Sequence, residues 1–209
     1  MIPHRLSARS RAAFAVVAVG VAAALAAGGA ESADPGLAAE LERGGLVLVL
    51  RHAATDFSKP DQEPVVLDDC GTQRNLTERG LVQARAIGYH ARRLGLKVGA
   101  VLASPYCRTL QTARLAFGRA RVSNALLNTS GQDHDARWRR QIRAARFLFG
   151  KKPRAGTLTV LVTHGSVVVD IADLGLVEGE TLVLRPLGNG RFRLIGRVLA
   201  NDWRLLRVS

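Results

Sequence analysis

The sequence predicts an α/β domain, a three-layer sandwich in which a mostly parallel central sheet is flanked by helices. The first observation is an apolar run without alternation, Leu46 to Leu50, which is typical of a strand covered on both faces. The second is another β-rich run, Thr157 to Thr163, more than a hundred residues later. The third is the helical periodicity of segments between these two runs. Both apolar runs end on a histidine, His52 and His164, and chemistry in such folds lies beyond the carboxyl ends of strands.

The chain length allows one well-buried domain behind a removable leader. The chain has 209 residues, 47% of them hydrophobic and 5% aromatic, which fits a compact α/β protein without a second full domain. Arg5, Arg9 and Arg11 precede the apolar residues 12–27 and the small residues 28–30, which is a secretory signal pattern. An uncleaved membrane anchor is the alternative, but it needs about twenty strongly apolar residues. We therefore predict a signal peptide over 1–30, a folded domain over 31–209, and a periplasmic or secreted protein.

The basic character belongs to the folded domain. Removal of Arg5, Arg9 and Arg11, with no acidic residue, lowers the formal net charge only from +13 to +10. An anionic partner is favoured over nucleic acid, because export separates the two and no basic motif with interleaved aromatic residues appears. A phosphorylated small molecule, such as a sugar phosphate, or the phosphate groups of an envelope glycolipid fit better. A solvated basic surface without a partner is the plainer alternative.

The first half of the domain has clear boundaries. A short helix or tail over Ala33 to Glu42 precedes a Gly-Gly turn and the first strand. The polar segment Phe57 to Gly71 has no sustained period and predicts a loop over the end of the sheet. Thr77 caps the helix that follows, and Gly95 ends it.

A second strand and helix place an arginine beside the expected site. Val98 to Ala103 predicts a short strand, and Ser104-Pro105 predicts a helix cap followed by proline at the first helical position. Arg108 then falls in the first helical turn, where free backbone N–H groups already favour an anion.

The second half predicts two further helices and a hairpin. Asp135 to Phe149 is a helix with an apolar side and a basic stripe, which is a solvated face or a contact with an anionic membrane surface. The stripe contains Arg137, Arg139, Arg140, Arg143 and Arg146. Ser166 to Leu174 predicts a helix, whereas Thr181 to Leu187 and Arg191 to Val198 predict a hairpin. Pro186 places the first hairpin strand near a sheet edge.

Cys70 and Cys107 are the only cysteines. In an oxidising compartment they could form an intramolecular disulfide, which would fix the position of the neighbouring Arg108. Two independent buried thiols are the alternative.

Arg51, His52, Arg108 and His164 are the candidate site residues, because all four follow the ends of predicted strands. Guanidinium groups match phosphate oxygens with forked donors and stay charged at physiological pH. A cationic neighbourhood keeps a histidine neutral, so a ring nitrogen is free to attack. The plainer alternative is a set of surface ion pairs and hydrogen-bonded polar groups.

These residues lie in motifs that together resemble the histidine phosphatase superfamily, which includes the phosphoglycerate mutases. The motifs are Arg51-His52-Ala53-Ala54-Thr55, Leu76-Thr77 with Gly80, Gln83 and Ala84, Ser104-Pro105 with Arg108, Gln111, Thr112 and Ala113, and Thr163-His164-Gly165. Asp69-Cys70, Arg74-Asn75-Leu76 and Ala200-Asn201-Asp202-Trp203 resemble a small exported bacterial subgroup, which includes a phosphatase of lipopolysaccharide core heptose phosphates.

The resemblance implies a phosphoglycerate mutase-like fold and a phosphomonoester hydrolase that needs no metal or other cofactor. It implies that His52 attacks phosphorus to form a phosphohistidine, while Arg51, Arg108 and His164 bind the phosphoryl group and stabilise its charge. The alternatives are a phosphate-binding pseudoenzyme of the same fold, a mutase-type phosphotransferase, and a metal hydrolase, for which a further ligand is missing.

Two positions depart from the family pattern. Ala53 replaces the usual glycine after the nucleophile and adds one methyl group. No motif supplies the carboxyl group that protonates the leaving oxygen in many members, although Asp133 and Asp135 are candidates and Asp135 is equally a helix cap. Without such an acid, the favoured leaving groups need little protonation, as in anomeric phosphates or phosphohistidine.

Overall fold

A single mixed sheet forms the centre of the domain. The structure is a computed structural model that describes residues 35–207, so the predicted signal peptide over 1–30 lies outside the described residues. The strand order is β3-β2-β4-β1-β5-β6. The strands are β1 (Val47–Arg51), β2 (Val98–Ala103), β3 (Arg121–Val122), β4 (Leu158–Thr163), β5 (Thr181–Gly188) and β6 (Arg191–Val198). The first four strands in the order are parallel and the hairpin β5–β6 is antiparallel, which confirms the mostly parallel sheet.

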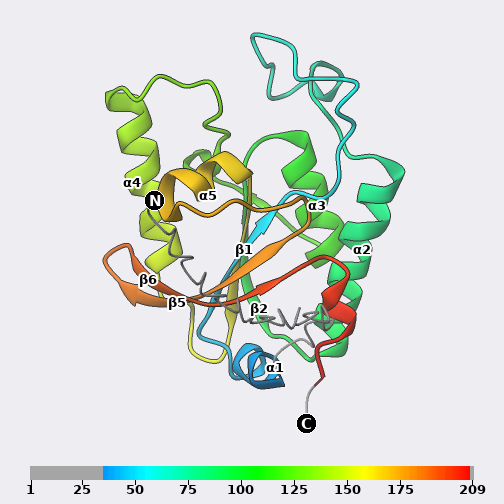
Figure 1. The fold of residues 1–209 in the computed structure, drawn as a ribbon, viewed down its shortest axis with the longest axis vertical. Helices are drawn as coiled ribbons and strands as arrows, with labels where there is room; N and C mark the ends of the chain where they lie inside the picture. The colour runs from blue at the N-terminus through cyan, green and yellow to red at the C-terminus, as the bar shows by residue number, and fades with distance from the viewer. Residues whose placement is uncertain (1–34, 208–209) are drawn as a thin grey trace, which may run out of the picture. The chain divides into compact units, whose positions relative to one another are not determined.

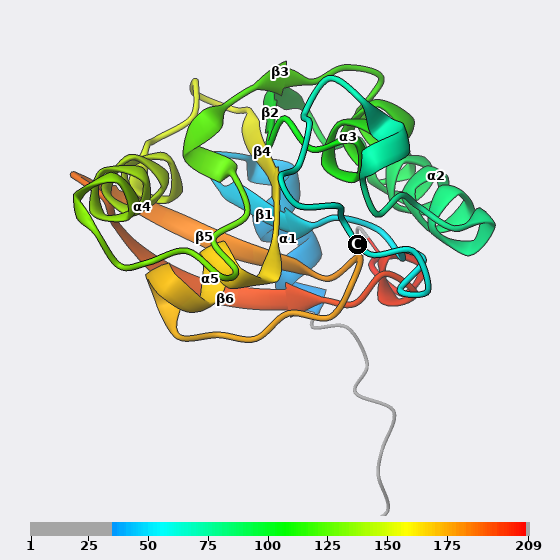
Figure 2. The ribbon, with the colours of Figure 1, turned by 90° about the horizontal axis from the view of Figure 1, so that it is seen from above.

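Helices cover both faces of this sheet, as Figures 1 and 2 show. The helices are α1 (Pro35–Arg43), α2 (Glu78–Arg93), α3 (Cys107–Phe117), α4 (Ala136–Gly150) and α5 (Gly165–Ala172). One core lies under α1, α2 and α3, where Leu48 and Leu50 of β1 meet Ile87. The other lies under α4 and α5, where Val47 and Val49 meet Phe149. Alternate residues of β1 thus enter opposite cores, which is why its apolar run is unbroken.

The helix caps follow the sequence in two cases and depart from it in one. The Thr77 side chain accepts a hydrogen bond from Gly80 N, and Asp135 accepts one from Trp138 N, so both predicted caps are confirmed. The predicted Ser104 cap is wrong, because α3 begins at Cys107 and its N-cap residue is Tyr106 without a side-chain bond. Ser104 Oγ accepts only a long bond from Tyr106 N, at 3.5 Å, and its shorter contact, at 2.9 Å, is with His164 Nε2.

The prediction for Pro186 holds only locally. The edge strand is β6, and β5 lies between β6 and β1. However, β1 pairs with β5 only from Thr181 to Leu184. Pro186 lies beyond that paired stretch and faces Phe192 of β6, so its missing N–H removes no bond to β1.

Among the described residues, no helix is long and apolar enough to cross a membrane.

The disulfide between Cys70 and Cys107 is present, as predicted. It joins the loop that follows β1 to the first residue of α3, directly before Arg108. A second contact supports the same junction, because Cys107 N donates a hydrogen bond to Gln73 Oε1 at 2.9 Å. The loop over the pocket is therefore fastened to the helix that carries Arg108.

Removal of this disulfide should lower stability substantially. The two cysteines are 37 residues apart, and closing a loop of that length in the unfolded chain corresponds to about 4 kcal/mol. We expect Cys70→Ser/Cys107→Ser to lower the midpoint of thermal unfolding by about 10 °C. Circular dichroism of the double variant and of the reduced wild type checks this expectation, and equal midpoints for variant and oxidised wild type would refute it.

Candidate active site

The carboxyl ends of β1 and β4 bring the two predicted histidines together. The two strands pair in parallel with Arg51 opposite Thr163, so His52 and His164 leave the sheet side by side. Their ring centroids are 5.5 Å apart. Both side chains are buried. The register of one parallel strand pair therefore fixes the spacing of the two imidazoles.

Arg108 reaches the same place from the neighbouring strand β2 through the first turn of α3. Its side chain is only 1% exposed. Arg108 Nη1 and Nη2 donate to the two carboxylate oxygens of Asp61 at 2.8 and 3.1 Å, and Nη1 also contacts the Arg74 carbonyl at 3.3 Å. The Arg108 guanidinium also lies over the Tyr106 ring, 4.4 Å from its centroid. These contacts fix the direction of the guanidinium plane.

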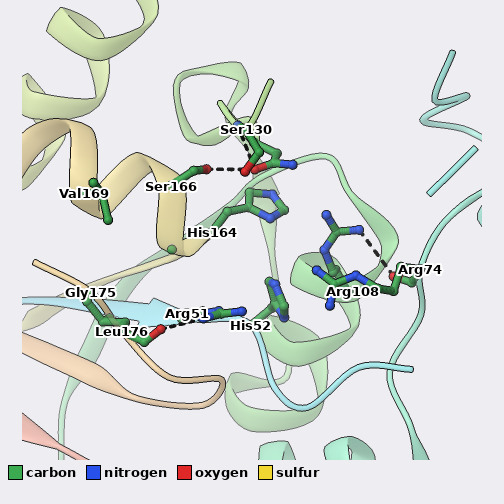
Figure 3. Close-up of a pocket in the computed structure, with 12 residues that line it drawn as sticks. Arg51, His52, Arg74, Arg108, Ser130, His164, Ser166, Val169, Gly175 and Leu176 are labelled. Atoms are coloured by element: carbon green, nitrogen blue, oxygen red, sulfur yellow. Dashed lines mark hydrogen bonds between the residues drawn. The ribbon is translucent and has the colours of Figure 1, made fainter. Parts of the chain in front are cut away.

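All four predicted side chains line one pocket of about 260 Å³. Figure 3 shows Arg51 and Arg108 on opposite sides of the two imidazoles. The lining consists of Arg51, His52, Arg74, Arg108, Asn128, Ser130, His164, Gly165, Ser166, Val169, Gly175 and Leu176. Three guanidinium groups and no carboxylate face this space, so an anion is the ligand that it fits.

The Nε atoms of Arg51 and Arg108 need acceptors. Within the described residues both atoms are buried and have no hydrogen-bond partner. Arg51 is held elsewhere, since its Nη1 donates to the Leu176 carbonyl at 2.5 Å. The anion-binding character of the pocket therefore rests on the three guanidinium groups that line it, Arg51, Arg74 and Arg108.

A backbone contact sets the tautomer of His52. Its Nδ1 lies 2.9 Å from the Ala53 carbonyl, and a carbonyl oxygen can only accept a hydrogen bond. Nδ1 therefore carries the proton and Nε2 carries the lone pair. The methyl group of Ala53 is fully buried, and Ala53 N donates to Thr112 Oγ1, so the departure from glycine fits.

Both imidazoles are held neutral. Burial lowers the pKa of His52 well below its ordinary value of 6.5, and the charges of Arg108, Arg51 and Arg74 lower it further. Burial also lowers the pKa of His164 strongly, with His52 and the same three arginines adding to the effect. A neutral His52 with a free Nε2 is a competent nucleophile at neutral pH.

These shifts predict how activity and stability change as the pH becomes acidic: activity persists and stability falls. Since the pKa of His52 is depressed in the folded protein, we expect the acid limb of kcat/KM to lie well below pH 6.5. The stability of the fold should fall as the pH drops below about 6.5, because the histidines bind protons in the unfolded chain that they do not bind in the folded protein. A pH series of kcat/KM and of unfolding midpoints checks both. An acid limb at pH 6.5 or above would contradict the burial of a neutral His52.

Three charged residues of the site escaped the sequence analysis as functional residues. Arg74 lines the pocket, while Asp61 and Glu178 bind its arginines. All three lie outside helices and strands, where periodicity gives no signal. Arg74 was noted only as part of the subgroup motif, and the acidic Phe57 to Gly71 loop was the only signal for Asp61.

The two acid candidates from the sequence lie elsewhere. Asp135 is exposed, caps α4, and has a lowered pKa because its carboxylate accepts the Trp138 N–H. Asp133 is also exposed. Neither residue lines the pocket, so the structure gives no support to either as the proton donor.

Comparisons with known proteins agree with this geometry. Residues 47–129 match the family model of the histidine phosphatase superfamily (branch 1). Both the family-model match and the fold support a relationship of this chain to the histidine phosphatase superfamily. The matched segment includes Arg51, His52 and Arg108, whereas His164 follows it. No curated protein matches the chain.

Solved structures show the histidine phosphatase fold. The protein histidine phosphatase SixA in complex with tungstate has a TM-score of 0.52 at 16% identity, over 75% of this chain and 98% of SixA. Rv3214 from Mycobacterium tuberculosis has a TM-score of 0.52 at 20% identity, again over 75% and 98%. A phosphoserine phosphatase variant from Entamoeba histolytica, solved with phosphoserine, has 0.50 at 12%, with the same coverage. These likenesses establish the fold.

Proposed function

We propose that this protein is a phosphomonoester hydrolase that forms a phosphohistidine on His52. The observation that carries the proposal is the free Nε2 of a neutral His52 in a pocket walled by Arg51, Arg108 and His164. Two proteins of similar fold support such a pocket: SixA was solved with tungstate, and a phosphoserine phosphatase variant was solved with phosphoserine. Catalysis here rests on positioning and on stabilisation of charge.

The reaction proceeds in two displacements. The Nε2 lone pair of His52 attacks phosphorus, the bond from phosphorus to the leaving oxygen breaks, and that oxygen keeps the electron pair. Arg51 and Arg108, which line the pocket, bind the equatorial oxygens through their guanidinium N–H groups. Water then attacks phosphorus, the P–N bond breaks, and its electron pair returns to Nε2.

The substrate class follows from the lack of a proton donor in the described pocket. Asp61 and Glu178 accept hydrogen bonds from the arginines of the site, and neither carboxyl group lines the pocket. Substrates whose leaving oxygen or nitrogen needs little protonation are therefore favoured, such as anomeric sugar phosphates, including one on an envelope glycolipid, or phosphohistidine. In a series of aryl phosphates, turnover should rise steeply as the leaving phenol becomes more acidic.

One experiment separates the hydrolase from its alternatives. Wild type is mixed with a radiolabelled aryl phosphate, and the quenched protein is analysed for label on His52. A hydrolase gives labelled protein and inorganic phosphate. A mutase-type phosphotransferase instead passes the label to an added alcohol, and a pseudoenzyme binds phosphate with no label and no turnover.

Metal independence is part of the proposal. Within residues 35–207 no group of three or more His, Cys, Asp or Glu is arranged to hold a metal ion. We expect a chelator to leave turnover unchanged, and a loss that a divalent cation restores would favour a metal hydrolase.

Export and membrane contact complete the proposal. Cleavage after the 1–30 segment would leave the protein in the periplasm or outside the cell, which N-terminal sequencing of the processed protein and cell fractionation test. The basic stripe on α4 is exposed throughout, and we propose that it contacts an anionic membrane surface. Its members are Arg137, Arg139, Arg140, Arg143 and Arg146.

Vesicle binding measures the contribution of this stripe. We expect Arg140→Gln/Arg143→Gln to weaken binding to vesicles that contain an anionic phospholipid by about tenfold or more. The matched control is Arg79→Gln/Arg85→Gln on the exposed side of α2, which removes the same charge elsewhere. Equal losses in both variants would show a general charge effect and no specific surface.

A further inference from the structure

A carboxylate lies beneath the arginines of the pocket, on the turn that precedes β5. Glu178 Oε1 is 3.8 Å from Arg51 Nη2, 3.3 Å from Arg74 Nη1 and 3.8 Å from His52 Nδ1. Its side chain is only 16% exposed. One negative charge thus contacts two guanidinium groups and the protonated edge of the proposed nucleophile.

The carboxylate is held firmly by Thr55. Thr55 Oγ1 donates to Glu178 Oε1 at 2.5 Å, and Thr55 N donates to Oε2 at 3.2 Å. Arg74 Nη1 also donates to Thr55 Oγ1, which links the third guanidinium to the same group. The Arg74 guanidinium lies 4.2 Å from the centroid of the Phe57 ring. Both oxygens of the Glu178 carboxylate therefore accept hydrogen bonds that fix its orientation.

The backbone of the turn is anchored to the nucleophile itself. Gly179 N donates to the His52 carbonyl at 3.0 Å, and Gln83 connects Ala54 N to the Glu178 carbonyl. Gly179 has a φ of +80°, and a Cβ there would lie 2.6 Å from the Gln83 amide carbon. A side chain at position 179 would displace the turn, so its glycine keeps Glu178 in register with His52.

We propose that Glu178 is a positioning residue that stabilises the imidazolium form of His52 during phosphoryl transfer. This inference rests on the proposed function. When Nε2 attacks phosphorus, its lone pair becomes the P–N bond, while Nδ1 keeps its proton and the ring gains a positive charge. Arg51, Arg74 and Arg108 act on the ring as positive charges; Asp61 pairs with Arg108, and Glu178 is the carboxylate that lies 3.8 Å from His52 Nδ1. The charge disappears when water breaks the P–N bond.

The same carboxylate opposes binding of a phosphate dianion, because like charges repel. Its loss should therefore slow the chemical step and strengthen phosphate binding, two effects of opposite sign. A residue that only ties loops together would weaken both when it is removed. The comparison of kcat with phosphate affinity therefore distinguishes the two roles.

Glu178→Gln tests the proposal in the full-length processed protein. We expect kcat for an aryl phosphate to fall about a hundredfold without a rise in KM, which is the low end for one preorganised electrostatic group. We expect the Kd of inorganic phosphate, measured by calorimetry, to fall about tenfold. An unchanged kcat, or a parallel loss of turnover and phosphate affinity, would overturn the proposal.

Two further variants protect the test. Glu40→Gln makes the same chemical change on α1, where the carboxylate bonds Arg185 Nη2 at 2.6 Å and does not line the pocket, so kcat and phosphate Kd should stay unchanged. Thr55→Val keeps the Glu178 charge but removes its 2.5 Å hydrogen bond, and an intermediate loss of kcat is expected if Glu178→Gln fails to fold. If wild type binds phosphate without turnover, the proposed function fails and this inference fails with it; if wild type turns over and Glu178→Gln keeps the wild-type kcat, this inference alone fails.

Discussion

His52→Ala should reduce phosphatase turnover by about four orders of magnitude or more. The variant removes the proposed nucleophile, His52 Nε2. This atom carries the lone pair because the proton is on Nδ1, which donates to the Ala53 carbonyl. Loss of a covalent nucleophile costs more than loss of a binding group, because the remaining site can only assist direct attack by water. Turnover of an aryl phosphate and label on the protein are measured together, and both should disappear.

The matched control for this variant is His90→Ala. His90 lies on α2, outside the pocket, so the same truncation should leave turnover within about twofold of wild type. Binding adds a second check, because His52→Ala keeps Arg51 and Arg108 and should still bind inorganic phosphate. Full turnover in His52→Ala would remove the covalent mechanism, and lost phosphate binding would indicate a damaged pocket.

Local signals in the sequence were sufficient to predict most of the fold. The unbroken apolar residues of β1 required cover on both faces, and the caps at Thr77 and Asp135 use side chains that bond within three residues. Such contacts depend on neighbouring residues only, so a sequence can display them. Ser104 shows the limit, because its hydroxyl keeps only a long local bond to Tyr106 N and makes its shorter contact with His164, 60 residues away.

The residues of the candidate site show the same difference between local and distant signals. Arg51 ends β1, His52 and His164 directly follow strands, and Arg108 lies in the first turn of α3, so the predicted sheet accounts for their meeting in one pocket. Their catalytic roles stay predictions.

Asp61 and Glu178 instead lie on irregular segments whose positions depend on distant partners. The disulfide and Gln73 fasten the loop of Asp61 to α3, and the Gly179 N–H fastens the turn of Glu178 to His52. No periodic pattern encodes those partners, which explains why the two carboxylates were missed.

Arg108→Lys should lower kcat/KM by about a hundredfold to a thousandfold, although it keeps the positive charge. The guanidinium bonds both oxygens of Asp61 and the Arg74 carbonyl, which fixes the plane of the N–H groups that it presents to the pocket. An ammonium group has no fork, so it cannot bond Asp61 at two points and still present a directed pair of donors to the transition state. The loss should appear mainly in kcat if the pair is aligned on the transferring phosphoryl group.

Arg119→Lys makes the same replacement at an arginine that bonds the Val98 carbonyl and lies outside the pocket, and it should be neutral. Asp61→Asn probes the partner, because it retains the guanidinium but removes the charge that aligns it. We expect a loss smaller than that of Arg108→Lys, and a double variant no worse than Arg108→Lys alone, since both changes act through one group. Additive losses would mean that Asp61 and Arg108 act separately, and an unaffected Arg108→Lys would mean that charge alone suffices at this position.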